Sequence, residues 1–127
     1  MSKIDHVADL GLTPVGFVDG EYVVELKLEE RHLNIGGIVH GGVYCSLLDT
    51  AMARSYIKSV SKDGLPAVTL EMKVNFLGAA SEGTLRATGK VVVETRRTVF
   101  VEGRVENEDG RLLARGSATM MLSSPTS

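Results

Sequence analysis

The feature that most constrains the fold is one helical segment that is apolar on nearly every side. Residues 43–60 have helical periodicity, and the apolar side chains that cover most of the circumference are Leu47, Leu48, Ala51, Met52 and Ile57. A helix of this kind is buried inside a protein. The segment is too short to span a membrane, and Asp49 and Arg54 interrupt it. We therefore expect one central helix that the rest of the chain surrounds.

Alternating apolar and polar residues, which are typical of strands, occupy most of the remaining chain. Residues 14–28 form two short runs around Asp19-Gly20, a two-residue hairpin signal. Four longer runs follow the helix at residues 68–77, 85–94, 98–107 and 112–122, with turn residues between them. In the first of these runs the even-numbered residues are apolar, and they alternate with Thr69, Glu71, Lys73 and Asn75. Serial hairpins predict an antiparallel meander, because parallel strands need longer crossovers.

The lengths of the helix and the strands are compatible with each other. A helix of about 18 residues is ~27 Å long, and a strand of about ten residues spans ~33 Å. We predict an α+β fold in which a curved antiparallel sheet wraps a long central helix. Residues 1–127 form a single domain in this prediction, with 1–13 as an N-terminal segment and 123–127 as a loose tail. The sheet edges stay open, so we expect a homo-oligomer that closes them.

Composition argues against several classes of partner. The 127 residues include 14 Lys plus Arg and 16 Asp plus Glu, a formal net charge of −2, so a nucleic-acid or anionic-membrane partner is not expected. The single cysteine, Cys45, permits no intramolecular disulfide and no thiolate zinc site. His6, His32 and His40 lack metal-ligand spacing, and we expect neither a metal nor another cofactor. No secretory signal is apparent, so a cytoplasmic location is expected.

The loop before the central helix carries the first candidate site. Its sequence from residue 32 is HLNIGGIVHGG, and Gly41 and Gly42 lie where the first helical N–H groups lack intrahelical partners. Such a helix start attracts negative charge, either a phosphate or a developing oxyanion. Glycines there also let another chain or a ligand approach the backbone closely. The alternative is a tight loop that only lets the helix enter the sheet.

Asp49 is the second candidate, because a carboxylate in an apolar helix is costly to bury without partners. In one interpretation its carboxylate is bonded to a backbone or hydroxyl group, or faces solvent at a subunit seam. In the other it is a general base or nucleophile in a partly dry cleft. Cys45 lies one helical turn earlier, and without a histidine base it fits a core residue better than a thiol nucleophile.

Together these residues carry a family resemblance. H-x-N at residues 32–34, G-x-x-H-G-G at 37–42 and Asp49 on the helix resemble the phenylacetate-pathway (PaaI-like) group of acyl-CoA thioesterases in the 4-hydroxybenzoyl-CoA thioesterase superfamily. The strand at residues 68–77 is also similar, and the match runs roughly from Val15 to Leu122. The resemblance implies a hotdog fold in a homotetramer, a dimer of dimers. It also implies hydrolysis of an acyl- or aryl-acyl-CoA thioester to free acid and CoA.

The resemblance also implies a role for each matching residue. Asp49 corresponds to the carboxylate that acts as nucleophile or general base, and the Gly41 backbone N–H corresponds to the donor that polarises the thioester carbonyl. Asn34 corresponds to an asparagine that places the carbonyl or the water. Thr69 corresponds to a residue that holds water near the carboxylate across the dimer seam. His40 fits a residue that orients the loop, because no serine elbow or second acid accompanies it.

The expected CoA contacts involve Gly42, Arg96 and Arg97. The two arginines suit the phosphates of CoA because guanidinium groups match phosphate geometry, although a solvated hairpin turn is the alternative. The sequence departs from the family pattern at Gly78-Ala79, where many relatives have Arg-Pro, and at Thr95, where many have Gly. Both departures fall near the expected CoA end of the site.

Two other functions remain open at this level. A noncatalytic acyl-CoA-binding or sensor domain would keep the pocket but would not need Asp49 or Asn34. A hotdog dehydratase or hydratase would need a histidine opposite an acid, usually in a proline-rich loop that this chain lacks. The carboxylate and the amide together favour a thioesterase.

Overall fold

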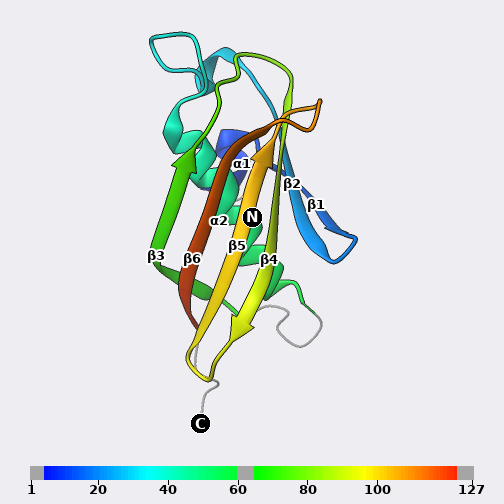
Figure 1. Ribbon diagram of the computed structural model, residues 1–127, viewed down its shortest axis with the longest axis vertical. Helices are drawn as coiled ribbons and strands as arrows, with labels where there is room; N and C mark the ends of the chain where they lie inside the picture. The colour runs from blue at the N-terminus through cyan, green and yellow to red at the C-terminus, as the bar shows by residue number, and fades with distance from the viewer. Residues whose placement is uncertain (1–4, 60–64, 123–127) are drawn as a thin grey trace.

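The computed structural model describes residues 5–59 and 65–122 and contains one long helix held in a curved six-stranded sheet (Figure 1). The elements in chain order are α1 (His6–Leu10), β1 (Thr13–Val18), β2 (Glu21–Lys27), the short 3-10 helix η1 (Glu30–His32), α2 (Gly41–Ile57), β3 (Ala67–Phe76), β4 (Thr84–Glu94), β5 (Thr98–Glu106) and β6 (Leu112–Leu122). This arrangement confirms the predicted hotdog fold. The expected loose tail, 123–127, lies outside the described residues.

The sheet order corrects the predicted simple meander. Every neighbouring pair is antiparallel and the order is β1-β2-β4-β5-β6-β3, so β3 pairs with β6 at the far edge instead of with β4. The link between β3 and β4, residues 77–83, is longer than a usual hairpin loop, and the backbone N–H groups of Leu77 and Gly78 donate to the Leu113 carbonyl of β6. The chain therefore crosses the end of the sheet before β4 begins (Figure 1).

The central helix is buried as the sequence predicts, but its ends differ. It runs from Gly41 to Ile57 instead of from residue 43 to 60, and position 60 lies outside the described residues. His40 is the reason for the earlier start, because it occupies the N-cap and its side chain accepts from the Gly42 N–H. The side chains that are fully buried against the sheet are Leu47, Leu48, Ala51 and Met52.

A row of glycines allows this helix to lie close to the sheet. Gly89, Gly103 and Gly116 are direct cross-strand partners on β4, β5 and β6. A Cβ added at Gly89 would lie 2.5 Å from the Ala51 carbonyl oxygen of α2. Because no side chain fits between these strands and the helix, the sheet can curve tightly around α2.

A bulge in β3 decides which of its residues face the helix. The pairing of β3 with β6 shifts between Thr69 and Glu71, which leaves Leu70 as the extra residue. Before the bulge the more buried positions are odd-numbered, Ala67 and Thr69, and after it they are even-numbered, such as Met72 and Val74. The strict alternation predicted for this strand is therefore wrong, and Thr69 shares the helix side with the apolar residues beyond the bulge.

Candidate active site

The centre of the candidate site is a hydrogen bond between α2 and the edge strand β3. The Thr69 hydroxyl donates to Asp49 Oδ1 across 2.6 Å, and both side chains are half-buried. Within residues 5–59 and 65–122 the second carboxylate oxygen, Oδ2, has no hydrogen-bond or ion-pair partner. The carboxylate is thus held through one oxygen and leaves the other for a ligand or a water.

The contact gives Thr69 a partner within its own chain, because its hydroxyl reaches Asp49 there. The bulge at Leu70 is the physical cause, because it turns Thr69 toward α2. The expected role of Thr69, holding water near the carboxylate across a subunit seam, stays a prediction.

Cys45 lies one helical turn before Asp49 but is a poor nucleophile. Burial raises the pKa of the Cys45 thiol, and the negative charge of Asp49 raises that pKa further. A thiol with a raised pKa stays protonated near neutral pH and does not attack a carbonyl. The raised pKa therefore argues against Cys45 as a thiol nucleophile.

The start of α2 presents the Gly41 N–H as a backbone donor without a partner in the described parts of the chain. The Gly42 N–H donates to His40 Nδ1 across 2.8 Å and the Val43 N–H donates to the His40 carbonyl, whereas the Gly41 N–H has no partner among the described residues. A helix N-terminus carries partial positive charge, so a carbonyl oxygen at Gly41 would be polarised there. His40 itself caps the helix, while Gly42 uses its N–H for that cap.

An exposed aromatic ring lies beside Gly41, and the sequence analysis did not single it out. A Cβ added at Gly41 would lie 3.3 Å from the Phe76 ring, which also stacks on Tyr44 with centroids 6.2 Å apart. Phe76 is the last residue of β3, and its side chain is 56% exposed. In the sequence, Phe76 is visible only as a large apolar residue at the end of a predicted strand. No local pattern predicts the bulge in that strand.

The glycine loop is held in shape by Asn34. Its Oδ1 accepts from the Gly36 N–H at 2.8 Å and from the Ile38 N–H at 3.4 Å, and its backbone N–H and carbonyl bond to Ile38 and Gly37. These bonds occupy the oxygen of the Asn34 side-chain amide. They leave its NH₂ group available as a donor. Among the described residues, Asn34 and Asp49 of one chain share no hydrogen bond.

Helix geometry separates the free N–H from the carboxylate. Gly41 and Asp49 are eight residues apart on α2, which corresponds to ~12 Å along the axis at about 1.5 Å per residue. Side chains on a helix tilt toward its N-terminus, which closes only a small part of that distance. A single thioester carbonyl therefore cannot contact both groups of one helix at hydrogen-bond distance.

The two arginines expected to bind CoA lie far from the glycine loop of the same chain. Arg96 and Arg97 are exposed in the turn between β4 and β5, and the Arg97 carbonyl accepts from the Leu122 N–H. Figure 1 shows this turn at the lower end of the molecule and the start of α2 at the upper end. One chain by itself does not bring Arg96, Arg97 and Gly41 together.

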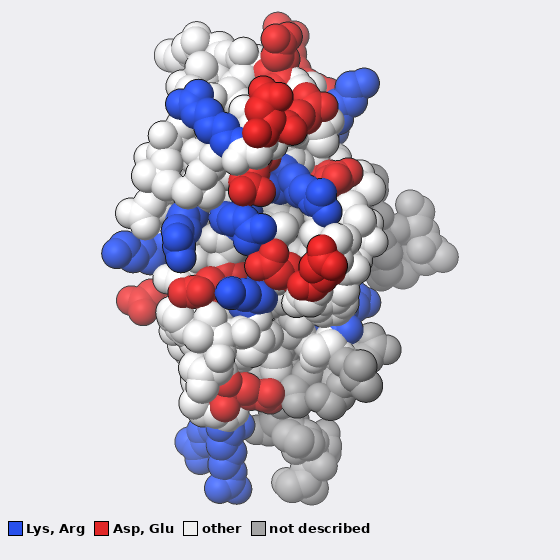
Figure 2. All heavy atoms as spheres, turned by 45° about the vertical axis from the view of Figure 1, so that its right-hand side comes forward, with Lys and Arg blue, Asp and Glu red and all other residues white. Residues whose placement is uncertain are grey.

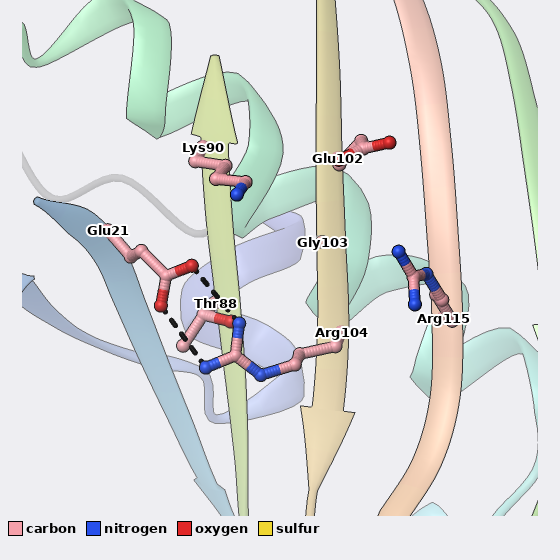
Figure 3. A pocket seen from close by; sticks show the side chains of 7 residues that line it. All are labelled: Glu21, Thr88, Lys90, Glu102, Gly103, Arg104 and Arg115. Atoms are coloured by element: carbon pink, nitrogen blue, oxygen red, sulfur yellow. Dashed lines mark hydrogen bonds and ion pairs between the residues drawn. The ribbon is translucent and has the colours of Figure 1, made fainter. Parts of the chain in front are cut away.

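The outer face of the sheet carries a separate polar hollow. Charged residues of both signs are interspersed over this face (Figure 2), and the lining residues of the hollow are Glu21, Thr88, Lys90, Glu102, Gly103, Arg104 and Arg115 (Figure 3). Two hydrogen bonds of 3.1 Å join the Arg104 guanidinium to the Glu21 carboxylate. None of the predicted site residues lines this hollow, so it is distinct from the Asp49 site.

The part of the chain that the structure describes contains no helix long and apolar enough to cross a membrane. Within residues 5–59 and 65–122, no cluster of three or more His, Cys, Asp or Glu side chains is arranged as a metal site.

Fold and site together define a class of protein: a hotdog-fold enzyme in which the Asp49 carboxylate is bonded to the edge strand and the Gly41 N–H at the helix start has no partner among the described residues. The model of the thioesterase superfamily matches residues 36–114, and the chain belongs to this family. It is accordingly a thioester hydrolase by class.

Three relatives show how far the similarity extends. The chain is 27% identical over 113 residues to acyl-coenzyme A thioesterase 13 of Homo sapiens, covering 87% of this chain and 79% of that protein. A conserved protein from Pseudomonas aeruginosa has a solved structure with 32% identity, a TM-score of 0.87 and 95% coverage of both chains. A Bacillus halodurans protein solved with CoA has 27% identity and a TM-score of 0.85, with coverage of 94% of this chain and 79% of that one.

Proposed function

We propose that this chain hydrolyses acyl-CoA thioesters and that Asp49 is the catalytic carboxylate. The observation that carries the proposal is the half-buried Asp49, whose Oδ1 accepts from Thr69 while Oδ2 has no partner among the described residues. The human acyl-coenzyme A thioesterase and the Bacillus protein solved with CoA support CoA thioesters as the substrate class.

The reaction at Asp49 takes one of two balanced routes. As a general base, Oδ2 accepts a proton from a water whose oxygen adds to the thioester carbonyl carbon. As a nucleophile, Oδ2 itself adds to that carbon, and water later cleaves the resulting anhydride. In both routes the C–S bond breaks, the CoA sulfur leaves as a thiolate that takes up a proton, and the carboxylic acid remains.

Two chains are needed to build one site in this proposal. The Gly41 N–H that stabilises the oxyanion and the Asp49 that attacks lie too far apart on one helix, so a second copy supplies one of them. The open edge of the sheet nearest Asp49 is β3, a strand of ten residues that carries Thr69. Antiparallel pairing of two β3 edges would satisfy their free backbone groups and bring each glycine loop toward the other chain's Asp49.

The same arrangement gives Arg96 and Arg97 a role. Because they lie at the end of the molecule opposite the glycine loop of their own chain, they would serve a site completed by another subunit. Their guanidinium groups would bind the phosphates of CoA, with Gly42 lining the path at the helix start. We propose a tetramer, a dimer of dimers, as the assembly that contains these sites.

The test of the proposal is replacement of Asp49. We expect Asp49→Asn and Asp49→Ala to lower kcat by about 10³-fold or more, because an essential base or nucleophile is lost, while calorimetry still detects acyl-CoA binding. Release of CoA is followed with a thiol-detecting dye over a panel of acyl-CoA substrates. Asp109→Asn, in the exposed turn after β5, is the matched control and should keep parental activity.

Turnover by Asp49→Ala within tenfold of the parent would exclude Asp49 as the catalytic group. A parent that binds acyl-CoA without releasing CoA from any member of the panel would support a sensor domain instead.

A further inference from the structure

The Phe76 ring is an exposed aromatic beside Gly41, whose backbone N–H has no partner among the residues that the structure describes. Its ring atoms Cε1 and Cζ would lie 3.3 and 3.4 Å from a Cβ at Gly41, so the ring covers the side of Gly41 where a side chain would begin. A residue larger than glycine at this position would crowd the ring. The ring and the Gly41 N–H therefore belong to the same part of the helix start.

The ring is supported from behind by a buried aromatic residue. Tyr44 is 3% exposed, its plane is inclined by 30° to that of Phe76, and its hydroxyl donates to the Gly78 carbonyl at 3.0 Å. This bond ties the backbone two residues after Phe76 to the same helix. Tyr44 and the strand thus hold the ring in place while 56% of the Phe76 side chain stays open to solvent.

We propose that Phe76 is the residue that positions the acyl group and sets its specificity. The inference rests on the proposed function, because it takes the Gly41 N–H as the donor to the thioester carbonyl. When that oxygen bonds to the N–H, the substituents of the carbonyl carbon lie near the ring, and the proposal places the first acyl carbons over it. A flat apolar ring favours acyl groups that are apolar next to the carbonyl, either alkyl or arylalkyl, and disfavours acyl groups that end in a carboxylate.

The experiment compares kcat/KM for acetyl-, hexanoyl-, phenylacetyl- and succinyl-CoA in the parent and in Phe76→Ala. We expect a loss of about tenfold or more for hexanoyl- and phenylacetyl-CoA, and a loss of less than about threefold for acetyl-CoA, because only the larger apolar groups lose their contact. Phe76→Leu, which keeps an apolar side chain, should recover part of the hexanoyl rate and less of the phenylacetyl rate.

Phe17 provides a matched control. Phe17 is an exposed phenylalanine, 46% open, on β1 at the opposite edge of the sheet. Its ring packs edge-on against Tyr22, with ring centroids 5.2 Å apart. Phe17→Ala should leave the order of preference among the four substrates unchanged.

An equal loss of kcat/KM for all four substrates, or no loss, would overturn the proposal for Phe76. Either result would show that the ring does not select among acyl groups. If Phe76→Ala does not fold, as judged by its thermal transition, the Phe76→Leu profile decides by the same criterion. The proposed function fails by a different result, namely retained turnover in Asp49→Ala, so the two failures are distinguishable.

Discussion

At the scale of single residues, two carboxylates, Asp49 and Glu21, differ in how their oxygens are bonded. Within the described parts of the chain, the Asp49 carboxylate is bonded only by the Thr69 hydroxyl at Oδ1, which suits the proposed role of accepting a proton or attacking a carbonyl. Glu21 is instead held by two hydrogen bonds from Arg104, and Arg104 also lies 3.5 Å from Glu106. Both oxygens of the Glu21 carboxylate on the outer face are thus bonded to Arg104, and we expect this pair to contribute to stability.

The Glu21–Arg104 pair predicts a pH-dependent contribution to stability. Hydrogen bonds from Arg104 hold the pKa of the Glu21 carboxyl below its ordinary value of 4.5, against a smaller opposing effect of burial. A lowered pKa in the folded state stabilises the fold above the unfolded pKa, and this contribution is lost as the pH falls through the folded pKa. We expect Glu21→Gln to lower the free energy of unfolding by about 0.5–1 kcal/mol at pH 7, since both partners are partly exposed.

Urea denaturation at pH 7 and at pH 3 measures this effect. The difference between Glu21→Gln and the parent should shrink at the lower pH, because protonation of the parent's carboxyl removes the charge that the variant lacks. Glu82→Gln is the control, because Glu82 is exposed and has no ion pair within the described residues. A difference that is the same at both pH values would show that the charge of Glu21 is not what stabilises the pair.

At the scale of elements, the contact between α2 and the sheet depends on the absence of side chains at three strand positions. The three glycines of the cross-strand row remove side chains where the helix passes, and a Cβ at Gly89 would meet the helix backbone itself. At Gly116 the nearest atoms are the Lys73 carbonyl at 3.1 Å and a Leu48 methyl at 3.2 Å. The methyl can move, whereas the backbone of α2 moves only with the whole helix.

These distances predict a graded effect of alanine on stability. Gly89→Ala should lower the free energy of unfolding by about 3 kcal/mol, at the upper end of the range for overpacked cores, and Gly116→Ala by about 1 kcal/mol. The measurement is chemical denaturation of each variant beside the parent. Equal losses for the two variants would mean that α2 shifts as a rigid body and that the distance to its backbone does not control the packing.

At the scale of the whole molecule, the active unit follows from which site residues share a chain. Thr69 and Asp49 are bonded within one chain, whereas Asn34 belongs to the loop that leads to Gly41. In the shared site that we propose, Asp49 and Thr69 would therefore come from one subunit, and the glycine loop would come from its partner.

Mixing inactive variants tests which subunit supplies each residue of the site. Asp49→Ala mixed with Asn34→Ala should recover about a quarter of the parental sites, because about half of randomly formed dimers are mixed and each has one intact site of two. Asp49→Ala mixed with Thr69→Ala should recover nothing beyond the residual activity of the Thr69 variant. Activity of the mixtures is measured after subunit exchange has been demonstrated by mass spectrometry. Recovery in the second mixture, or a fully active monomer in sedimentation, contradicts the shared site.

Much of the fold was predictable from the sequence because its signals are local. Apolar residues on all sides of one helix require burial, and period-two alternation predicted the β4, β5 and β6 strands to within one residue at each end. The candidate carboxylate was predictable for the same reason, since Asp49 is conspicuous in an apolar helix. That Asp49 and Asn34 act in catalysis stays a prediction.

The features that only the tertiary structure decided are those set by distant parts of the chain. Whether β3 pairs with β4 or with β6 depends on the path of residues 77–83 over the end of the sheet, and the local alternation pattern is the same in both cases. The bulge at Leu70 likewise depends on the register with β6, and it places Thr69 on Asp49 and sets the side on which Phe76 meets Gly41. The sequence by itself determined which segments are helix and strand, because burial and periodicity act over neighbouring residues. The tertiary structure decided which side chains meet, because register and crossover are settled only when segments far apart in the chain pack together.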